Sequence, residues 1–227
     1  MSVPTPNSAM STPEARRSFI QAQTTLATPP LTPEIRLHLA TEITPIWQAT
    51  EATLEANNLP PPYWAFAWPG GQALTRFLLD HADRIRGKRV LDFAAGSGLS
   101  AIGAKMAGAE KVQANEIDDF AIEAILLNAA SNNVALEVLR HDLIGRNEGW
   151  DVVLAGDVCY ERPMAEAILP WLRGLARRGT TVLMADPGRA YLPASGLEEI
   201  ARYDVPTSLE LEDRTSRTTR VLRLLGD

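Results

Sequence analysis

The sequence predicts an α/β fold, a mostly parallel sheet with helices on both faces and an antiparallel hairpin at one edge. From residue 88 onward, short apolar segments alternate with segments of helical character, the pattern of a parallel sheet with crossover helices. A glycine-rich turn follows the first apolar segment. The expected strands are 89–93, 111–116, 136–140, 151–155, 180–185 and the edge hairpin 198–203 with 218–225, and the expected helices are 99–107, 118–131 and 162–178.

Length and composition predict one domain with an N-terminal extension. The chain has 227 residues, 45% of them hydrophobic, which suffices for one sizeable core. Residues 1–30 are rich in Pro, Ser, Thr and Ala and are expected to form a mobile arm with a helix beginning near Thr12. Residues 31–87 are expected to form a helical layer, with a helix opening at Thr32 and interrupted at Pro45, and an aromatic segment. Residues 88–227 are the expected core domain.

Composition excludes several classes of function. A net charge of -6 argues against a broad nucleic-acid surface, which needs clustered cations. One cysteine and three scattered histidines give neither a disulfide nor a zinc-ligand pattern, so we expect no metal site. No apolar run approaches the roughly 18 residues of a membrane span, and the N-terminus lacks the apolar core of a secretory signal. We expect a cytoplasmic, monomeric protein with no membrane partner.

The turn after the first strand predicts a cofactor that contains adenosine. The strand ends in Asp92 and turns through Gly96 and Gly98 into a helix, whose positive N-terminal end faces the ligand. Gly96-x-Gly98-x-x-Ala101 also fits a dinucleotide fingerprint, with Glu116 lying 20 residues after Gly96. However, the carboxylate of Asp92 favours the cationic amino-acid end of S-adenosylmethionine over a pyrophosphate. None of the four tyrosines has the lysine four residues later that one common dehydrogenase dyad requires.

The later strand ends supply further candidate site residues, because ligands bind at the carboxyl ends of such strands. Glu116 is placed to accept hydrogen bonds from both ribose hydroxyls, or else favours the next helix through its dipole. Asp142 is placed to accept a hydrogen bond from the adenine amino group, or else only shapes a turn. Asp186 either adds negative charge near an acceptor or shapes the turn 186–189, and the two interpretations stay open.

The segment after the fourth strand points to chemistry rather than cofactor binding. Asp157 and Tyr160 emerge together where a methyl acceptor would meet the sulfonium, an acid to orient an amine and an aromatic wall to shape a channel. Methyl transfer is an in-line displacement, which depends mainly on orientation. The alternative is an Asp cap before a helix and a buried core Tyr. Upstream, Trp64 and Trp68 are placed either to wall the pocket or to belong to the core.

Five separated blocks of the chain resemble the lysine methyltransferases of the electron transfer flavoprotein beta subunit. The blocks are 63–74, 92–98, 103–109, 156–160 and 186–189, within a match over roughly residues 60–195. That family belongs to the seven-strand, Rossmann-like (class I) S-adenosylmethionine-dependent methyltransferases with an Asp-x-x-Tyr motif. The resemblance implies methylation of lysines beside the loop by which the beta subunit docks on its dehydrogenases. One departure is Ala94, where many methyltransferases have a glycine.

The site residues follow from the motifs and the resemblance together. The predicted cofactor contacts are Trp68, Asp92, Gly96, Gly98, Glu116, Asp142 and Gly156; the predicted catalytic residues are Asp157 and Tyr160; and the predicted acceptor contacts are Trp64, Asp157, Tyr160 and Asp186. Two other functions remain open at this point. One is an N-methyltransferase for a small amine or pyridine on the same fold, and the other is a dinucleotide-binding protein without methyltransferase activity.

Overall fold

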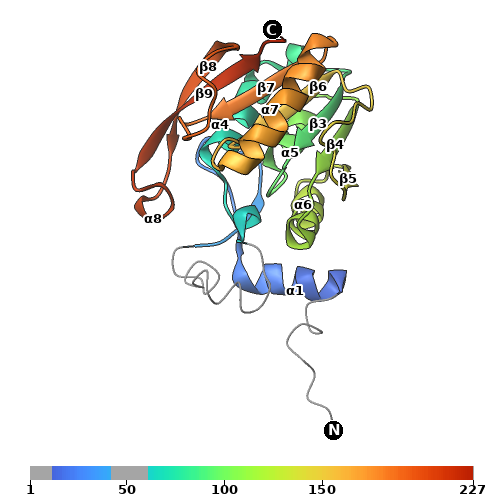
Figure 1. The fold of residues 1–227 in the computed structure, drawn as a ribbon. Helices are drawn as coiled ribbons and strands as arrows, with labels where there is room; N and C mark the ends of the chain where they lie inside the picture. The colour runs from blue at the N-terminus through green and yellow to red at the C-terminus, as the bar shows by residue number, and fades with distance from the viewer. Residues whose placement is uncertain (1–11, 42–60, 227) are drawn as a thin grey trace.

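The computed structural model describes residues 12–41 and 61–226, and its centre is a seven-stranded sheet (Figure 1). The strand order is β5-β4-β3-β6-β7-β9-β8. Neighbouring strands from β5 to β7 run parallel, whereas β9 pairs antiparallel with both β7 and β8. The predicted fold class is therefore confirmed, edge hairpin included. The strands are β3 (Arg89–Phe93), β4 (Lys111–Asn115), β5 (Glu137–Leu139), β6 (Val152–Gly156), β7 (Thr181–Asp186), β8 (Leu197–Pro206) and β9 (Ser216–Leu224).

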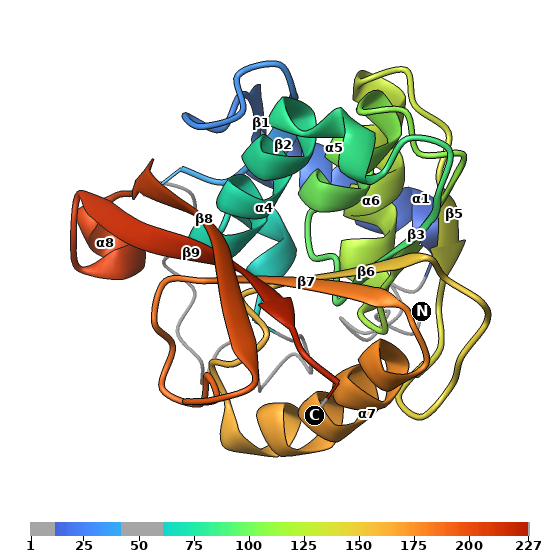
Figure 2. The ribbon, with the colours of Figure 1, turned by 90° about the horizontal axis from the view of Figure 1, so that it is seen from above.

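Helices cover both faces of this sheet, which explains why its central strands are largely apolar on both sides (Figure 2). Successive strand residues point to opposite faces. Val90 and Leu154 pack on the side of α4 and α5, whereas Leu91 and Val153 pack on the side of α7. No helix among the described residues is long and apolar enough to cross a membrane. The helices are α1 (Pro13–Gln23), α4 (Pro69–Asp80), α5 (Leu99–Met106), α6 (Asp119–Ser131), α7 (Arg162–Arg177) and the short α8 (Leu209–Glu212), with 3-10 turns η2 (Tyr63–Ala65) and η3 (Ala82–Arg84).

The helix predicted near Thr12 is confirmed as α1, and it packs against α6. The Thr12 hydroxyl accepts a hydrogen bond from the Ala15 N–H at 3.2 Å, which caps the first turn. Arg16 pairs with Asp119 at 2.5 Å, and the fully buried Ile20 packs among residues of α6. The helix α1 is thus joined to the domain by both charge and apolar contact.

The helix predicted to open at Thr32 is wrong, because the described part of that segment forms β2 (Leu37–Leu39), which pairs antiparallel with β1 (Thr25–Ala27). The Arg36 and His38 N–H groups donate to the side chains of Asn132 and Asn128 at 2.9 and 2.8 Å. These long-range hydrogen bonds hold an extended backbone against the local helix-start signal. The predicted interruption at Pro45 lies outside the described residues.

Close packing of α4 on α5 gives a first prediction about stability. A Cβ on Gly103 would lie 2.5 Å from Thr75 Cγ2, whereas a Cβ on Gly71 would meet only Leu99 at an ordinary 3.9 Å. We expect Gly103→Ala to lower the free energy of unfolding by about 1–3 kcal/mol through overpacking. Gly71→Ala should leave it unchanged or raise it by up to about 1 kcal/mol through helix propensity. Urea denaturation measures both variants, and equal effects would contradict the assigned packing.

Candidate active site

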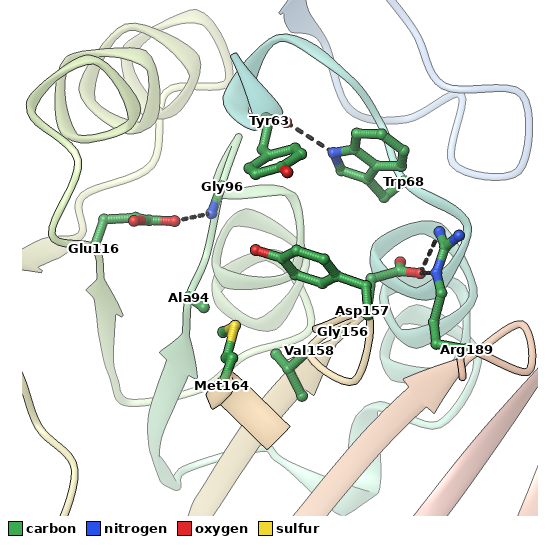
Figure 3. Close-up of a pocket in the computed structure, with 11 residues that line it drawn as sticks. Tyr63, Trp68, Ala94, Gly96, Glu116, Gly156, Asp157, Val158, Met164 and Arg189 are labelled. Carbon is green, nitrogen blue, oxygen red and sulfur yellow. Dashed lines mark hydrogen bonds and ion pairs between the residues drawn. The ribbon is translucent and has the colours of Figure 1, made fainter. Parts of the chain in front are cut away.

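A cavity of about 270 Å³ lies at the carboxyl ends of β3, β4 and β6 (Figure 3). This is the edge of the sheet at which the sequence places its candidate residues. One side of the cavity is formed by the turn after β3 and the end of β4, the other by the segment after β6 and by aromatic side chains. The lining residues are Tyr63, Trp68, Ala94, Gly96, Glu116, Gly156, Asp157, Val158, Tyr160, Met164 and Arg189.

The turn after β3 exposes backbone to the cavity at Gly96. Ala94, Gly96 and Gly98 all have left-handed backbone, with φ of 52°, 53° and 78°. A Cβ built on Gly96 would meet no atom within 4 Å, so a ligand can approach its backbone closely. Gly98 has a different role, because its Cβ would press on Ile125 at 3.1 Å while Gly98 serves as the N-cap of α5. It does not line the cavity.

Glu116 reaches the cavity from the end of β4 and is fixed by backbone groups. Its Oε1 accepts a hydrogen bond from the Gly96 N–H at 2.8 Å, and its Oε2 accepts one from the Ile117 N–H at 3.1 Å. Burial raises the pKa of this carboxyl, an effect that the backbone hydrogen bonds oppose. The carboxylate is therefore a rigid acceptor at the edge of the cavity, suited to a pair of hydroxyl groups.

Asp92 supports the turn from below. It is buried at the end of β3, and its Oδ2 accepts a hydrogen bond from the Ala101 N–H in the first turn of α5 at 2.8 Å. Burial raises the pKa of Asp92 to about 7, and the nearby carboxylate of Glu116 adds to the rise. Asp92 does not line the cavity itself. It places a titratable charge beneath the glycine turn.

Asp157 joins three parts of the site through both of its carboxylate oxygens. Its Oδ2 accepts a hydrogen bond from the Gly70 N–H in the first turn of α4 at 2.5 Å, and its Oδ1 accepts two from Arg189 at 2.9 and 3.1 Å. Burial raises the pKa of Asp157 to about 6, although the guanidinium of Arg189 opposes this shift. The carboxylate thus caps α4, whose own N-cap residue, Trp68, has no side-chain capping bond.

Aromatic rings form the acceptor side of the cavity, and they include Trp68, which the sequence placed among the cofactor contacts. The ring centroid of Tyr63 lies 5.5 Å from that of Tyr160 and 6.0 Å from that of Trp68. The Trp68 indole N–H donates to the Tyr63 carbonyl at 2.8 Å, which fixes the ring. Burial raises the pKa of Tyr160 to about 12, so its phenol keeps its proton at neutral pH. An aromatic wall that includes the neutral hydroxyl of Tyr160 therefore faces the end of β6.

Besides Gly98 and Asp92, three more of the predicted site residues do not line the cavity. Trp64 is only 2% exposed and stacks on Phe120, which corrects its predicted role as an acceptor contact. Asp186 is 1% exposed, and its Oδ1 accepts hydrogen bonds from the Gly188 and Arg189 N–H groups, so it shapes the turn. Asp142 Oδ1 accepts a hydrogen bond from the Ile144 N–H at 2.9 Å. Its contact with adenine stays a prediction.

The structure adds residues for which the sequence analysis assigned no role. Tyr63 replaces its neighbour Trp64 in the wall, and Arg189 comes from the turn 186–189. Val158 and Met164 complete the apolar lining. Only Arg189 carried a signal, since a cation in a rigid turn at the same sheet edge as Asp157 is a natural partner for it. Among the described residues, no group of three or more His, Cys, Asp or Glu is placed to hold a metal ion.

Comparison with known proteins identifies the family. A protein of Xenopus laevis named electron transfer flavoprotein beta subunit lysine methyltransferase is 43% identical over 204 residues, covering 87% of this chain and 82% of that protein. The Homo sapiens protein of the same name is 37% identical over 201 residues, covering 84% of this chain and 74% of that protein. The chain belongs to this family of lysine methyltransferases.

Two further comparisons relate the chain to other methyltransferases. The family model of ribosomal protein L11 methyltransferase matches residues 65–159 of the enzyme. The crystal structure of magnesium protoporphyrin IX methyltransferase from Synechocystis PCC 6803 with bound S-adenosylhomocysteine aligns with a TM-score of 0.51 at 18% identity. That alignment covers 68% of this chain and 81% of the other, and it shows the shared fold. S-adenosylmethionine is the cofactor.

The described residues fit this cofactor at the β3–β4 side of the cavity. Glu116 offers fixed carboxylate oxygens for a diol, and Gly96 offers open backbone beside them. Asp92 provides negative charge under the turn, which suits a cationic amino-acid end. The opposite side of the cavity, with its aromatic wall and Asp157, is left for the methyl acceptor.

The left-handed backbone at Ala94 leads to a prediction about stability. Left-handed backbone costs about 1–2 kcal/mol in a residue that has a Cβ, and glycine does not have this cost. Glycine loses more chain entropy on folding, however, which lowers stability by about 0.5–1 kcal/mol. Ala94→Gly should therefore raise the free energy of unfolding by up to about 1 kcal/mol. Ala95→Gly is the matched control, because Ala95 does not have left-handed backbone. It should lower stability by about 0.5–1 kcal/mol. Urea denaturation compares the two, and a loss of stability in both would contradict strain at Ala94.

Asp92 gives a prediction about pH. Its pKa of about 7 in the folded protein exceeds its ordinary value of 3.8, so the unfolded chain releases this proton at lower pH and ionisation disfavours folding. The wild type should lose stability relative to Asp92→Asn as the pH rises from about 4 through 7. The change should be at least about 1.4 kcal/mol, the equivalent of one pKa unit. Denaturation without cofactor at pH 5 and pH 8 measures it, and a difference independent of pH would refute the shift.

Proposed function

We propose that the enzyme methylates lysines of the electron transfer flavoprotein beta subunit, next to the loop by which that subunit recognises its dehydrogenases. The names of the relatives support this substrate. The observation that carries the proposal is that one cavity joins the cofactor-side residues Gly96 and Glu116 to the acceptor-side residues Asp157 and Tyr160. A lysine side chain entering along the aromatic wall reaches the cofactor side without leaving this cavity.

The residues of the site promote methyl transfer chiefly by orientation. Bound S-adenosylmethionine supplies the methyl group as an electrophile on its sulfonium. Tyr63, Trp68 and Tyr160 enclose the aliphatic part of the lysine and exclude water. The phenol of Tyr160 and the carboxylate of Asp157 offer acceptors that align the amine. Alignment of this kind accounts for several powers of ten in rate.

The proposed substrate is tested by incubating the enzyme with radiolabelled S-adenosylmethionine and recombinant electron transfer flavoprotein, with a lysate of the source organism alongside. We expect a single labelled band at the mobility of the beta subunit. Label on other proteins only would reject the substrate and keep the activity. Labelling of a small-molecule fraction with no labelled protein would favour the small-amine alternative.

The role of the aromatic wall is tested by Tyr160→Ala. Loss of the ring removes one side of the acceptor channel, and we expect kcat/KM for the protein substrate to fall about 100-fold, because misalignment by about 1 Å has effects of that size. Tyr191→Ala is the matched control, since Tyr191 is 38% exposed against 37% for Tyr160 but does not line the cavity. It should keep its activity. Equal activity in both variants would contradict the assigned acceptor channel.

A further inference from the structure

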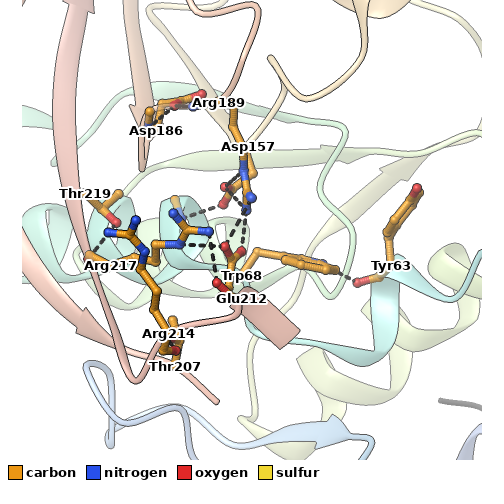
Figure 4. A network of polar contacts seen from close by, with 12 residues as sticks. Tyr63, Trp68, Asp157, Asp186, Arg189, Thr207, Glu212, Arg214, Arg217 and Thr219 are labelled. Atoms are coloured by element: carbon orange, nitrogen blue, oxygen red, sulfur yellow. Dashed lines mark hydrogen bonds and ion pairs between the residues drawn. The ribbon is translucent and has the colours of Figure 1, made fainter. Parts of the chain in front are cut away.

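Arg189 lies between two carboxylates, one inside the cavity and one outside it (Figure 4). Toward the cavity, its Nε and Nη2 donate to Asp157 Oδ1 at 3.1 and 2.9 Å. Away from the cavity, its Nη1 and Nη2 donate to Glu212 at 3.2 and 2.5 Å. Its guanidinium carbon is also 5.9 Å from the centre of the Trp68 ring. One side chain thus contacts the acid and an aromatic ring of the acceptor side.

Glu212 reaches this position from a distant part of the chain. It ends α8, the short helix at the tip of the hairpin formed by β8 and β9, which extends past the end of the sheet (Figure 1). Its side chain is 1% exposed. Arg217 of β9 also binds Glu212: its Nε donates to Glu212 Oε2 at 3.0 Å, and its Nη2 donates to the Glu212 backbone carbonyl at 2.9 Å. Asp157, Arg189, Glu212 and Arg217 form a chain of alternating charge from the cavity to the hairpin.

Burial of the Glu212 carboxylate carries a cost in free energy, so we ask which function in the fold or the site explains it. A buried carboxylate pays a desolvation penalty that even good ion pairs only roughly offset, so such a pair is weak evidence for stability by itself. The guanidiniums of Arg189 and Arg217 do, however, fix the orientation of the Glu212 side chain, because each of their N–H groups has a defined direction. With Glu212 in place, Arg189 is held on both sides and cannot leave Asp157 for solvent.

We propose that Glu212 is a positioning residue for methyl transfer: by holding Arg189 from outside the cavity, it fixes the Asp157 carboxylate and the Trp68 ring that align the acceptor amine. The inference deepens the proposed function, because it assumes that a lysine amine enters beside Asp157. Without Glu212, Arg189 keeps its charge but loses the fork that orients it. Asp157 then has a mobile partner, and the acceptor side of the cavity loses its fixed geometry.

The proposal makes a specific kinetic prediction for Glu212→Gln. We expect kcat for the protein substrate to fall 10- to 100-fold while its KM and the Kd for S-adenosylmethionine change less than 2-fold, since the cofactor side has no contact with Glu212. Arg189→Gln should have a similar or larger effect. In a double-mutant cycle, Arg189→Gln with Glu212→Gln should be no slower than Arg189→Gln alone, because Glu212 acts through Arg189.

Glu199→Gln is the matched control on the same hairpin. Glu199 pairs with Arg202 at 2.8 and 3.0 Å through an equally forked but exposed contact outside the site. It should leave kcat unchanged. Calorimetric cofactor binding and the unfolding midpoint show whether each variant is folded. If Glu212→Gln does not fold, Arg189→Lys replaces it, since this change keeps the charge and removes the fork; it should likewise lower kcat at unchanged cofactor Kd.

Three results would overturn the proposal. The first is full kcat in the folded Glu212→Gln variant, or in Arg189→Lys where that variant replaces it. The second is a higher KM at unchanged kcat, which would make the hairpin tip a docking element. The third is a multiplicative loss of kcat in the double variant. If the flavoprotein is not methylated by the wild type, the proposed substrate fails, and the same cycle is run on whichever protein the wild type labels in the lysate. The role of Glu212 is then tested separately from the identity of the substrate.

Discussion

The acceptor side of the active site depends on the buried carboxylate of Asp157. It directly follows β6 in left-handed backbone, with φ of 55°, which turns the chain sharply after the strand. One oxygen caps α4 and the other binds Arg189. Because α4 begins directly after Trp68, the same carboxylate positions one ring of the aromatic wall through the start of that helix. Asp157, Trp68 and Arg189 therefore form one connected unit, in which each group holds the others in place.

Close backbone contact makes this unit possible. A Cβ on Gly70 would lie 2.5 Å from the Ala185 carbonyl oxygen and from Asp157 Oδ2, and one on Gly156 would lie 3.1 Å from the Gly71 N atom. Glycine is required at position 70 and favoured at position 156, because the first turn of α4 rests directly on the ends of β6 and β7. This contact brings the positive end of the helix against the carboxylate. The two sides of the cavity are consequently built differently, the cofactor side mainly from a local turn and the acceptor side from contacts between distant segments.

That difference explains how much of the site the sequence could predict. Local patterns predicted the strands and the turn through Gly96. They also predicted the positions of Glu116, Asp157 and Tyr160, because the carboxyl ends of parallel strands meet at the same edge of the sheet. The exchange of Trp64 for Tyr63 was not predictable, because which ring faces the cavity depends on the packing of Trp64 against Phe120 of α6. β2 was missed for a similar reason, and Glu212 has no local sequence signal that ties it to Asp157.

The partners of Asp157 also bear on the kind of catalysis this enzyme can perform. A general base must take a proton from the amine during the reaction. Burial alone would favour a neutral Asp157, yet its pKa rises only to about 6, because Arg189 and the Gly70 N–H oppose the shift. At neutral pH the group is mostly ionised, with both oxygens already accepting hydrogen bonds. Such a carboxylate is a weak base for an ordinary lysine ammonium, whose pKa is about 10.4. The carboxylate of Asp157 contributes by its fixed position. Its negative charge orients the amine and stabilises the positive charge that the nitrogen acquires as it accepts the methyl group.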